Sequence, residues 1–400
     1  MTETASRKRR RRKRQIYELG EFKLMGFSMA NALPGDEKVP VLTKAALLSD
    51  DPFFHHCVRA FARDIDAKLR DQGTPAHLAQ ASNFAVVVNP DFTATLYIDC
   101  IDYCLEMISK RAVQKGETVW SNDIGDIYRG SIVYPKLRTD QHFILCLRHG
   151  WKFLLIFDLT PEQLIDLDAL DITIGVGMRR LLFEQLYAAV ADERVLGAMI
   201  GRGWFPFNEL IGAEFDDLQK AIANDFNIDA VEKSLVAKFT PDRLALMTAR
   251  WWSNPQYEAR RVLLSEGVKL FSEGRNIPSI KTLLTEIEGV LRERHVPRTP
   301  GPQGMKKVLS VAFEDVLKFS GADSIYFPEQ FVVYLNTSIF AHFDPDQPAA
   351  EATRNTVSHG RAPSEAYTPL RALQIILTLD QIHRYITVPR HRKRKKYSTS

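Results

Sequence analysis

Residues 370–386 read LRALQIILTLDQIHRYI. The apolar residues at the middle of this stretch are Leu373, Ile375, Ile376, Leu377 and Leu379. They occupy nearly every angle around a helix axis, which is typical of a helix buried on all sides. The sequence therefore predicts a helix over about 366–386 at the centre of a helical bundle. Asp380 in this helix is either half of a surface ion pair with Arg384 or an acid that orients a catalytic arginine or histidine.

The run just before this helix, residues 354–360, reads RNTVSHG. Arginine offers a planar fork of N–H donors to phosphate oxygens, and histidine gives and takes protons near neutral pH. Two prolines before the run and a glycine at its end predict a short helix from about Ala349. On such a helix Asn355 and His359 lie one turn apart, with Arg354 on the flank. These three residues are the candidate catalytic residues for phosphodiester cleavage.

The run RNTVSHG, together with Tyr367 and the apolar helix, resembles the C-terminal half of a HEPN domain (higher eukaryotes and prokaryotes nucleotide-binding). Residues 276–294, NIPSIKTLLTEIEGVLRER, are similar to the first long helix of some members, and residues 203–212, GWFPFNELIG, to a block that often precedes it. Many members of this family are metal-independent ribonucleases of phage-defence and toxin systems. The resemblance implies a HEPN-like helical bundle in which two protomers join their motifs in one cleft.

The activity that this resemblance implies is endoribonucleolytic cleavage with 2′,3′-cyclic phosphate ends. Because RNA supplies its own nucleophile, the enzyme needs positioning, proton transfer and charge stabilisation, and no metal or cofactor is expected. His359 would act as general acid or base, Arg354 would neutralise the phosphorane oxygens, and Asn355 would hold the RNA backbone or the histidine tautomer. Asp380 and Tyr367 are candidates for supporting roles. The expected partners are RNA, a second copy of the chain, and an antitoxin or other defence protein.

Two other functions remain open. The first is a non-catalytic HEPN-like module for dimerisation or as the scaffold of a sensor. In that case Arg354 pairs with an acid and His359 caps a helix. The second is a nucleic-acid-binding protein that acts through its basic ends alone.

Both ends of the chain are strongly basic. The positively charged residues are Arg7, Lys8, Arg9, Arg10, Arg11, Arg12, Lys13 and Arg14 at the N-terminus, and Arg390, Arg392, Lys393, Arg394, Lys395 and Lys396 at the C-terminus. The net charge of the whole chain is +4, so removing these 14 charges leaves −10 for the body. Runs of like charge bind polyanions without reading sequence, and this binding weakens as salt rises. We expect these two arms to be disordered and to bind nucleic acid.

Several classes of protein are not indicated. No stretch approaches the roughly 18 apolar residues of a membrane helix, and the segment after the N-terminal arm is too interrupted by charge for a signal peptide, so a cytoplasmic protein without a membrane partner is expected. The cysteines at 57, 100, 104 and 146 form neither a disulfide framework nor a paired zinc motif. His149-Gly150, residues 126–129 and Gly175-Val-Gly177 are weak site candidates for which structural roles are favoured.

The N-terminal half has the pattern of an α+β region. After a loosely structured lead-in over 15–45, a helix is predicted over 51–72 and a second helix over about 99–110. Two hairpins are predicted from β-branched runs that flank turn residues, one over 84–98 and one over 142–157. These hairpins indicate a sheet of four to six strands.

From about residue 177 onward helices dominate. The expected helices are 181–190, 216–224, 229–238, 241–252, 255–271, 277–291, 305–319, 328–343, 349–360 and 366–386. Lys281, Glu286 and Glu288 are placed on a solvated helix face, and the aromatic clusters at 204–207 and 251–252 in the core. The overall expectation is an α+β chain: an N-terminal antiparallel or mixed sheet with helices, then an all-α region that ends in a HEPN-like bundle. The expected layout is an arm and lead-in (1–45), an α+β domain (46–175), a helical connector (176–254), the bundle (255–389) and a basic tail (390–400).

Overall fold

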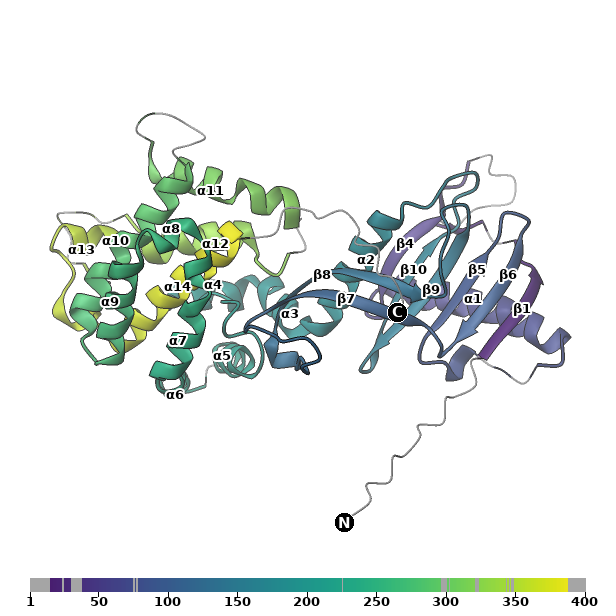
Figure 1. The fold of residues 1–400 in the computed structure, drawn as a ribbon, viewed down its shortest axis with the longest axis horizontal. Coiled ribbons are helices and arrows are strands. Elements are labelled where there is room, and N and C mark those ends of the chain that lie inside the picture. Colours follow the sequence, from purple (N-terminus) through teal and green to yellow (C-terminus); the bar gives the residue numbers. More distant parts are fainter. Residues whose placement is uncertain are drawn as a thin grey trace, which may run out of the picture. The chain divides into compact units, whose positions relative to one another are not determined.

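The computed structural model describes residues 15–387, apart from positions 24, 30–37, 75, 77, 225, 296–300, 302, 321–323, 343, 345, 347 and 348. The chain forms two compact units (Figure 1). The first comprises Met1–Glu106 and Ile127–Leu182, and the second comprises Met107–Asp126 and Phe183–Ser400. The mixed α+β class is confirmed, with an N-terminal antiparallel sheet followed by many helices.

The first unit is built on a six-stranded antiparallel sheet with the strand order β1-β6-β5-β9-β10-β4 (Figure 1). Its strands are β1 (Gln15–Glu21), β4 (Lys44–Leu48), β5 (Phe84–Val88), β6 (Thr93–Ile98), β9 (His142–His149) and β10 (Lys152–Asp158). Both predicted hairpins are present, because β5 pairs with β6 and β9 pairs with β10. The predicted number of strands is also confirmed.

Helices cover both faces of this sheet. On one face lies α1 (Pro52–Asp71), where Phe61 and Val86 are fully buried in one apolar cluster. On the opposite face Leu154 packs against a glycine of α2 (Leu167–Leu182). All five residues of the central strand β5 are buried, whereas β6 and edge strand β1 carry exposed residues, so both faces are covered only at the centre of the sheet.

Two expectations for this unit are wrong. Residues 99–110 do not form a helix: β7 (Asp102–Ser109) pairs with β8 (Ile124–Tyr134) in a separate two-stranded sheet. Residues 15–45 are not a loose lead-in either, because their described part supplies edge strand β1, the start of β4 and the short pair β2 (Phe27–Ser28) and β3 (Val41–Leu42). In each case a partner strand elsewhere in the chain decides the conformation, which local pattern does not reveal.

The glycine pair in α2 has a packing role. A Cβ atom at Gly175 would lie 2.6 Å from the backbone of Arg129 on β8, so only glycine permits this close approach. The guanidinium of Arg129 then pairs with Asp168 at 3.0 Å and Asp171 at 3.3 Å, both on the same helix. Two of the weak site candidates, residues 126–129 and 175–177, thus serve helix–strand packing.

Beyond residue 182 the described part of the second unit contains helices and no strand. Its α-helices are α3 (Glu184–Ala191), α4 (Glu193–Gly201), α5 (Ala213–Ala223), α6 (Ile228–Lys238), α7 (Pro241–Ala249), α8 (Pro255–Glu258), α9 (Arg261–Ser272), α10 (Asn276–His295), α11 (Met305–Ser320), α12 (Pro328–Tyr334), α13 (Arg354–Ser358) and α14 (Pro369–Thr387). In the described ranges, no helix is both long and apolar enough to cross a membrane.

The last helix, α14, is the centre of this unit, as its apolar sequence predicts. Every residue from Arg371 to Tyr385 is buried. Its polar groups are bonded to neighbouring elements: the Tyr257 hydroxyl donates to the Leu379 carbonyl at 2.7 Å, and the hydroxyl oxygens of Tyr334 and Thr378 are 2.9 Å apart. The aromatic residues Trp204, Phe205, Phe207 and Trp251 are fully buried, which confirms core packing for them.

Several helices differ in extent from the expectation, and the helix expected over 181–190 is divided at Phe183 between the end of α2 and α3. The helix over 255–271 is interrupted after Glu258, and the helix over 328–343 changes at Leu335 into a π-helical turn that ends at Ile339. The helix expected from Ala349 begins only at Arg354, because the preceding threonine caps it.

Candidate functional site

The motif RNTVSHG lies on α13, a single helical turn that is capped at both ends. At its start the Thr353 hydroxyl accepts a hydrogen bond from the Thr356 amide at 3.2 Å. At its end Gly360 has a φ of +65°, and the next amide, of Arg361, donates to the Thr356 carbonyl at 2.8 Å. This left-handed glycine closes the helix, as the sequence indicates. The motif therefore has a fixed backbone.

Arg354, at the first position of α13, is held by an acid of another helix. Its Nε forms an ion pair with Glu288 of α10, and its Nη1 donates to the Asn355 side-chain oxygen at 3.3 Å. Glu288 also accepts a hydrogen bond from Nε of Arg292 at 2.6 Å. Two guanidinium groups thus share one carboxylate, so a net positive charge remains. The Arg354 side chain is 31% exposed and still reaches solvent.

The face of α10 that was expected to be solvated carries contacts instead. Glu288 pairs with the motif arginine, and Glu286, which is buried, pairs with Arg260 at 3.0 Å. The ammonium group of Lys281 lies 5.7 Å from the centre of the Tyr367 ring. The expectation of a solvated face is therefore wrong for the two acids, because the charged side of α10 also packs against the bundle.

The other two motif residues differ in what they contact. The Asn355 amide group donates to the backbone carbonyls of Phe340 at 3.2 Å and Ala341 at 2.9 Å. It therefore ties α13 to the chain that leaves the π-helical turn. His359 is the C-cap residue of α13 and is exposed. The structure thus places three different side chains within one turn: Arg354, held by Glu288; Asn355, hydrogen-bonded to backbone; and His359, which is exposed.

Tyr367 and Asp380 lie in different surroundings. Tyr367 is half-buried beside α10, and burial raises the pKa of its hydroxyl. Asp380 is 1% exposed, so it is not part of a surface ion pair. It accepts hydrogen bonds from Arg250, from the Trp251 indole and from Arg384, and no motif residue is among its partners. The supporting role proposed for Asp380 at the motif is therefore wrong.

The group around Asp380 is a buried ion cluster. Arg250 donates from Nη2 to Asp380 at 2.8 Å and to Glu209 at 2.6 Å, and from Nη1 to the Lys110 carbonyl at 2.7 Å. Burial by itself would raise the pKa of Asp380, but the two neighbouring guanidinium groups lower it well below its usual range. Burial also lowers the pKa of Lys110 to about 8. This cluster joins the loop after β7 to the helices of the second unit, so its role is structural.

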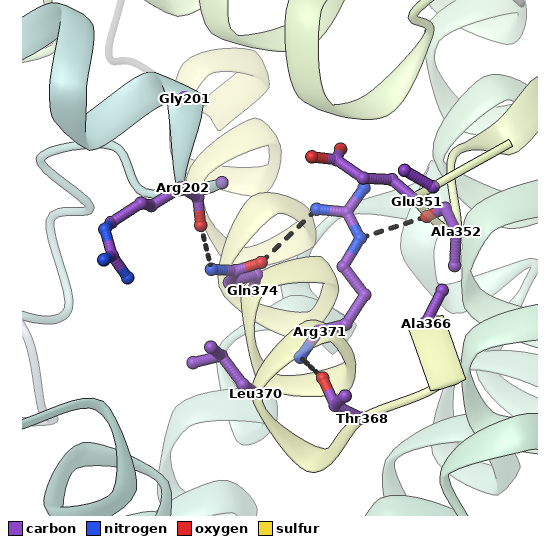
Figure 2. A pocket seen from close by; sticks show the side chains of 11 residues that line it. Gly201, Arg202, Glu351, Ala352, Ala366, Thr368, Leu370, Arg371 and Gln374 are labelled. Carbon is purple, nitrogen blue, oxygen red and sulfur yellow. Dashed lines mark hydrogen bonds between the residues drawn. The ribbon is translucent and has the colours of Figure 1, made fainter. Parts of the chain in front are cut away.

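A pocket of about 200 Å³ lies beside the chain that enters α13 (Figure 2). Its walls are Gly201, Arg202, Gly203, Ala350, Glu351, Ala352, Ala366, Thr368, Leu370, Arg371 and Gln374. Figure 2 shows the Arg371 guanidinium between Gln374 and the Glu351–Ala352 segment. Arg371 donates to the carbonyls of Ala352, at 3.0 Å, and Ser338, and to the Gln374 side chain at 3.3 Å. The pocket thus contains a buried cation.

Sequence reasoning missed Glu288 and Arg371. Glu288 looked like one of several charges on an ordinary helix surface, and no local pattern distinguishes it. Arg371 carried a usable signal, since it is a charged residue at the start of a helix whose middle is apolar on all sides. The basic arms, residues 7–14 and 390–396, lie outside the described residues.

Comparison with protein-family models, with curated proteins and with solved structures found no match to this chain.

Proposed function

We propose that the second unit is a metal-independent endoribonuclease in which His359 transfers the proton and Arg354 binds the phosphate. The observation that carries this proposal is the geometry of α13. One capped turn presents a guanidinium that is anchored by Glu288 and an exposed imidazole. An anchored cation and a side chain that can transfer a proton are the two components that this chemistry requires.

The reaction uses the 2′-hydroxyl of RNA as its nucleophile. His359 removes the proton of this hydroxyl or supplies one to the departing 5′-oxygen. Arg354 stabilises the charge that develops on the phosphorane oxygens, and Glu288 keeps its guanidinium in one orientation. Because Glu288 is shared with Arg292, its single charge does not cancel both cations.

Asn355 has a different role in this proposal from the one that the sequence indicates. Its amide group already donates to two backbone carbonyls. It therefore positions α13 and does not bind the RNA. A second protomer that brings its own motif to the same cleft, as in the HEPN family, would complete the site. A defence or toxin system is the setting that the resemblance implies.

A second candidate function is a non-catalytic scaffold for dimerisation or sensing. The specific observation in its favour is that Arg354 pairs with an acid and Asn355 is bonded to backbone. Side chains with these contacts stabilise a helical turn even without a substrate. The two candidates differ in what happens when His359, which is exposed, is changed.

The decisive experiment is RNA cleavage by the purified full chain in the presence of a chelator. We expect cleavage of single-stranded RNA with 2′,3′-cyclic phosphate ends, and a rate about a hundredfold or more lower for His359→Ala. Arg354→Lys should also be inactive, since a point charge cannot replace the planar fork. His342→Ala, which changes another exposed histidine of the same unit, is the matched control and should retain the parent rate.

The outcome also separates the two candidates. If the parent cleaves RNA and the His359 variant, folded normally by circular dichroism, cleaves at the same rate, the assignment of the proton-transfer group is wrong. If no RNA is cleaved by the parent while both variants lower its stability or its dimerisation, the scaffold function holds.

A further inference from the structure

The pocket next to α13 is lined largely by small residues and contains the buried charged side chain of Arg371. Glycine and alanine residues line much of it, and a Cβ atom at Gly203 would lie 2.5 Å from the Gln374 side chain. The volume of about 200 Å³ is below the roughly 300–1,000 Å³ of sites for drug-sized ligands. A ligand of a few heavy atoms fits this space better than a whole nucleotide.

Arg371 is the charged group of this pocket, and its donors are only partly used. A guanidinium has five N–H donors, and the three hydrogen bonds of Arg371 leave two of them available. All three acceptors are neutral oxygens. Among the described residues, no carboxylate lies within ion-pair distance of Arg371, although only 8% of the residue is exposed. A buried cation that makes no ion pair is costly, so this position favours a bound anion.

The start of α14 adds little to this preference. Thr368 and Leu370 line the same pocket as Arg371, but Pro369 has no N–H group and the Arg371 amide already donates to the Thr368 hydroxyl at 3.0 Å. Backbone N–H groups at a helix start attract anions only where they are unoccupied. Anion binding at this pocket therefore depends on the buried guanidinium.

One acid lines the pocket, and it opposes an incoming anion. Glu351 is exposed and lies near enough to Arg371 to raise the pKa of that guanidinium, while burial, the larger effect, lowers it. It makes no ion pair with Arg371. Figure 2 shows its carboxylate on the same side of the pocket as the guanidinium. An anion that enters must compete with this carboxylate.

We propose that this pocket binds a phosphate group, with the Arg371 guanidinium as the binding group and Glu351 as a weak internal competitor. The ligand is inorganic phosphate or the phosphate end of a small molecule. This site is separate from the proposed nuclease chemistry, because neither Arg354 nor His359 lines it. The hydrogen bonds of Arg371 to two backbone carbonyls hold the guanidinium in place for the ligand.

The test is calorimetric titration of the full chain with inorganic phosphate at constant ionic strength. We expect one saturable site, about fivefold tighter in Glu351→Gln because a nearby like charge is removed. In Arg371→Lys the affinity should fall at least about tenfold, because the fork is lost. Glu329→Gln, at an exposed glutamate that does not line the pocket, is the matched control and should bind like the parent. The basic arms are identical in every variant, so the differences between variants report the pocket.

Three outcomes would overturn the proposal. They are the absence of a saturable site in the correctly folded Glu351→Gln chain, equal affinities in the parent and Glu351→Gln, and tighter binding of acetate than of phosphate. If Arg371→Lys does not fold, the comparison of Glu351→Gln with Glu329→Gln decides alone. Titration with a phosphorylated sugar or nucleotide in place of inorganic phosphate distinguishes the two ligand sources by its relative affinity.

Discussion

Replacing Asp380 with asparagine is expected to destabilise the second unit by about 3–5 kcal/mol, the usual cost of breaking a buried ion pair from one side. The carboxylate accepts from Arg250 at 2.8 and 3.1 Å, from the Trp251 indole at 2.8 Å and from Arg384 at 3.4 Å. Each bond to a charged group contributes about 1.5–3 kcal/mol. These contributions do not add fully, since asparagine retains one oxygen that can accept. The variant leaves the buried Arg384 and the half-buried Arg250 with Glu209 as the remaining acid.

The assay is urea denaturation followed by tryptophan fluorescence, because the fully buried Trp204 and Trp251 both report the second unit. The matched control is Asp229→Asn. Asp229 is 86% exposed and lies 3.7 Å from Arg202, so its loss should change the free energy of unfolding by less than about 1 kcal/mol. Equal effects of the two substitutions would refute the view that the Asp380 cluster holds this unit together.

The pH dependence of the same variant gives a second check. The folded pKa of Asp380 is lowered, so the stabilisation is complete above the unfolded value of about 3.9 and is lost as the pH falls below it. The parent should therefore lose stability in acid more steeply than Asp380→Asn. Parallel curves below pH 4 would contradict the assigned charge.

Two further predictions concern packing and titration. Gly175→Ala should lower the free energy of unfolding by about 1–3 kcal/mol, because its Cβ would lie 2.6 Å from the Arg129 backbone. Gly197→Ala, on an open helix surface, is the control and should raise it by about 0.5–1 kcal/mol. Chemical denaturation followed by circular dichroism measures both. Burial lowers the pKa of His383 to about 4, so between about pH 6.5 and pH 4 the unfolded chain binds one proton more than the folded chain. As the pH is lowered through that window, the free energy of unfolding should decrease by up to about 1.4 kcal/mol per pH unit. His383→Gln should flatten this slope, while His342→Gln, at an exposed site, should leave it unchanged.

Much of the fold was predictable from the sequence by itself. The all-round apolar helix at 370–386, the amphipathic helices at 51–72 and 277–291 and the hairpins at 84–98 and 142–157 follow from hydrophobic period and turn residues. These patterns determine conformation because a helix or hairpin forms mainly between residues near in sequence. The end of the motif helix was also readable, since a glycine after it is a local signal, but its start was not, because the Thr353 cap places it at Arg354 and not at Ala349.

Only the tertiary structure decided which charged side chains meet. Glu288 pairs with an arginine 66 positions away, and Asp380 pairs with one 130 positions away, so neither contact leaves a trace in local sequence. The same holds for β7, whose strand conformation depends on pairing with β8, and for the phosphate-sized pocket around Arg371. Packing of the whole chain brings these charged side chains together and buries them, and their burial and their partners together set their pKa values.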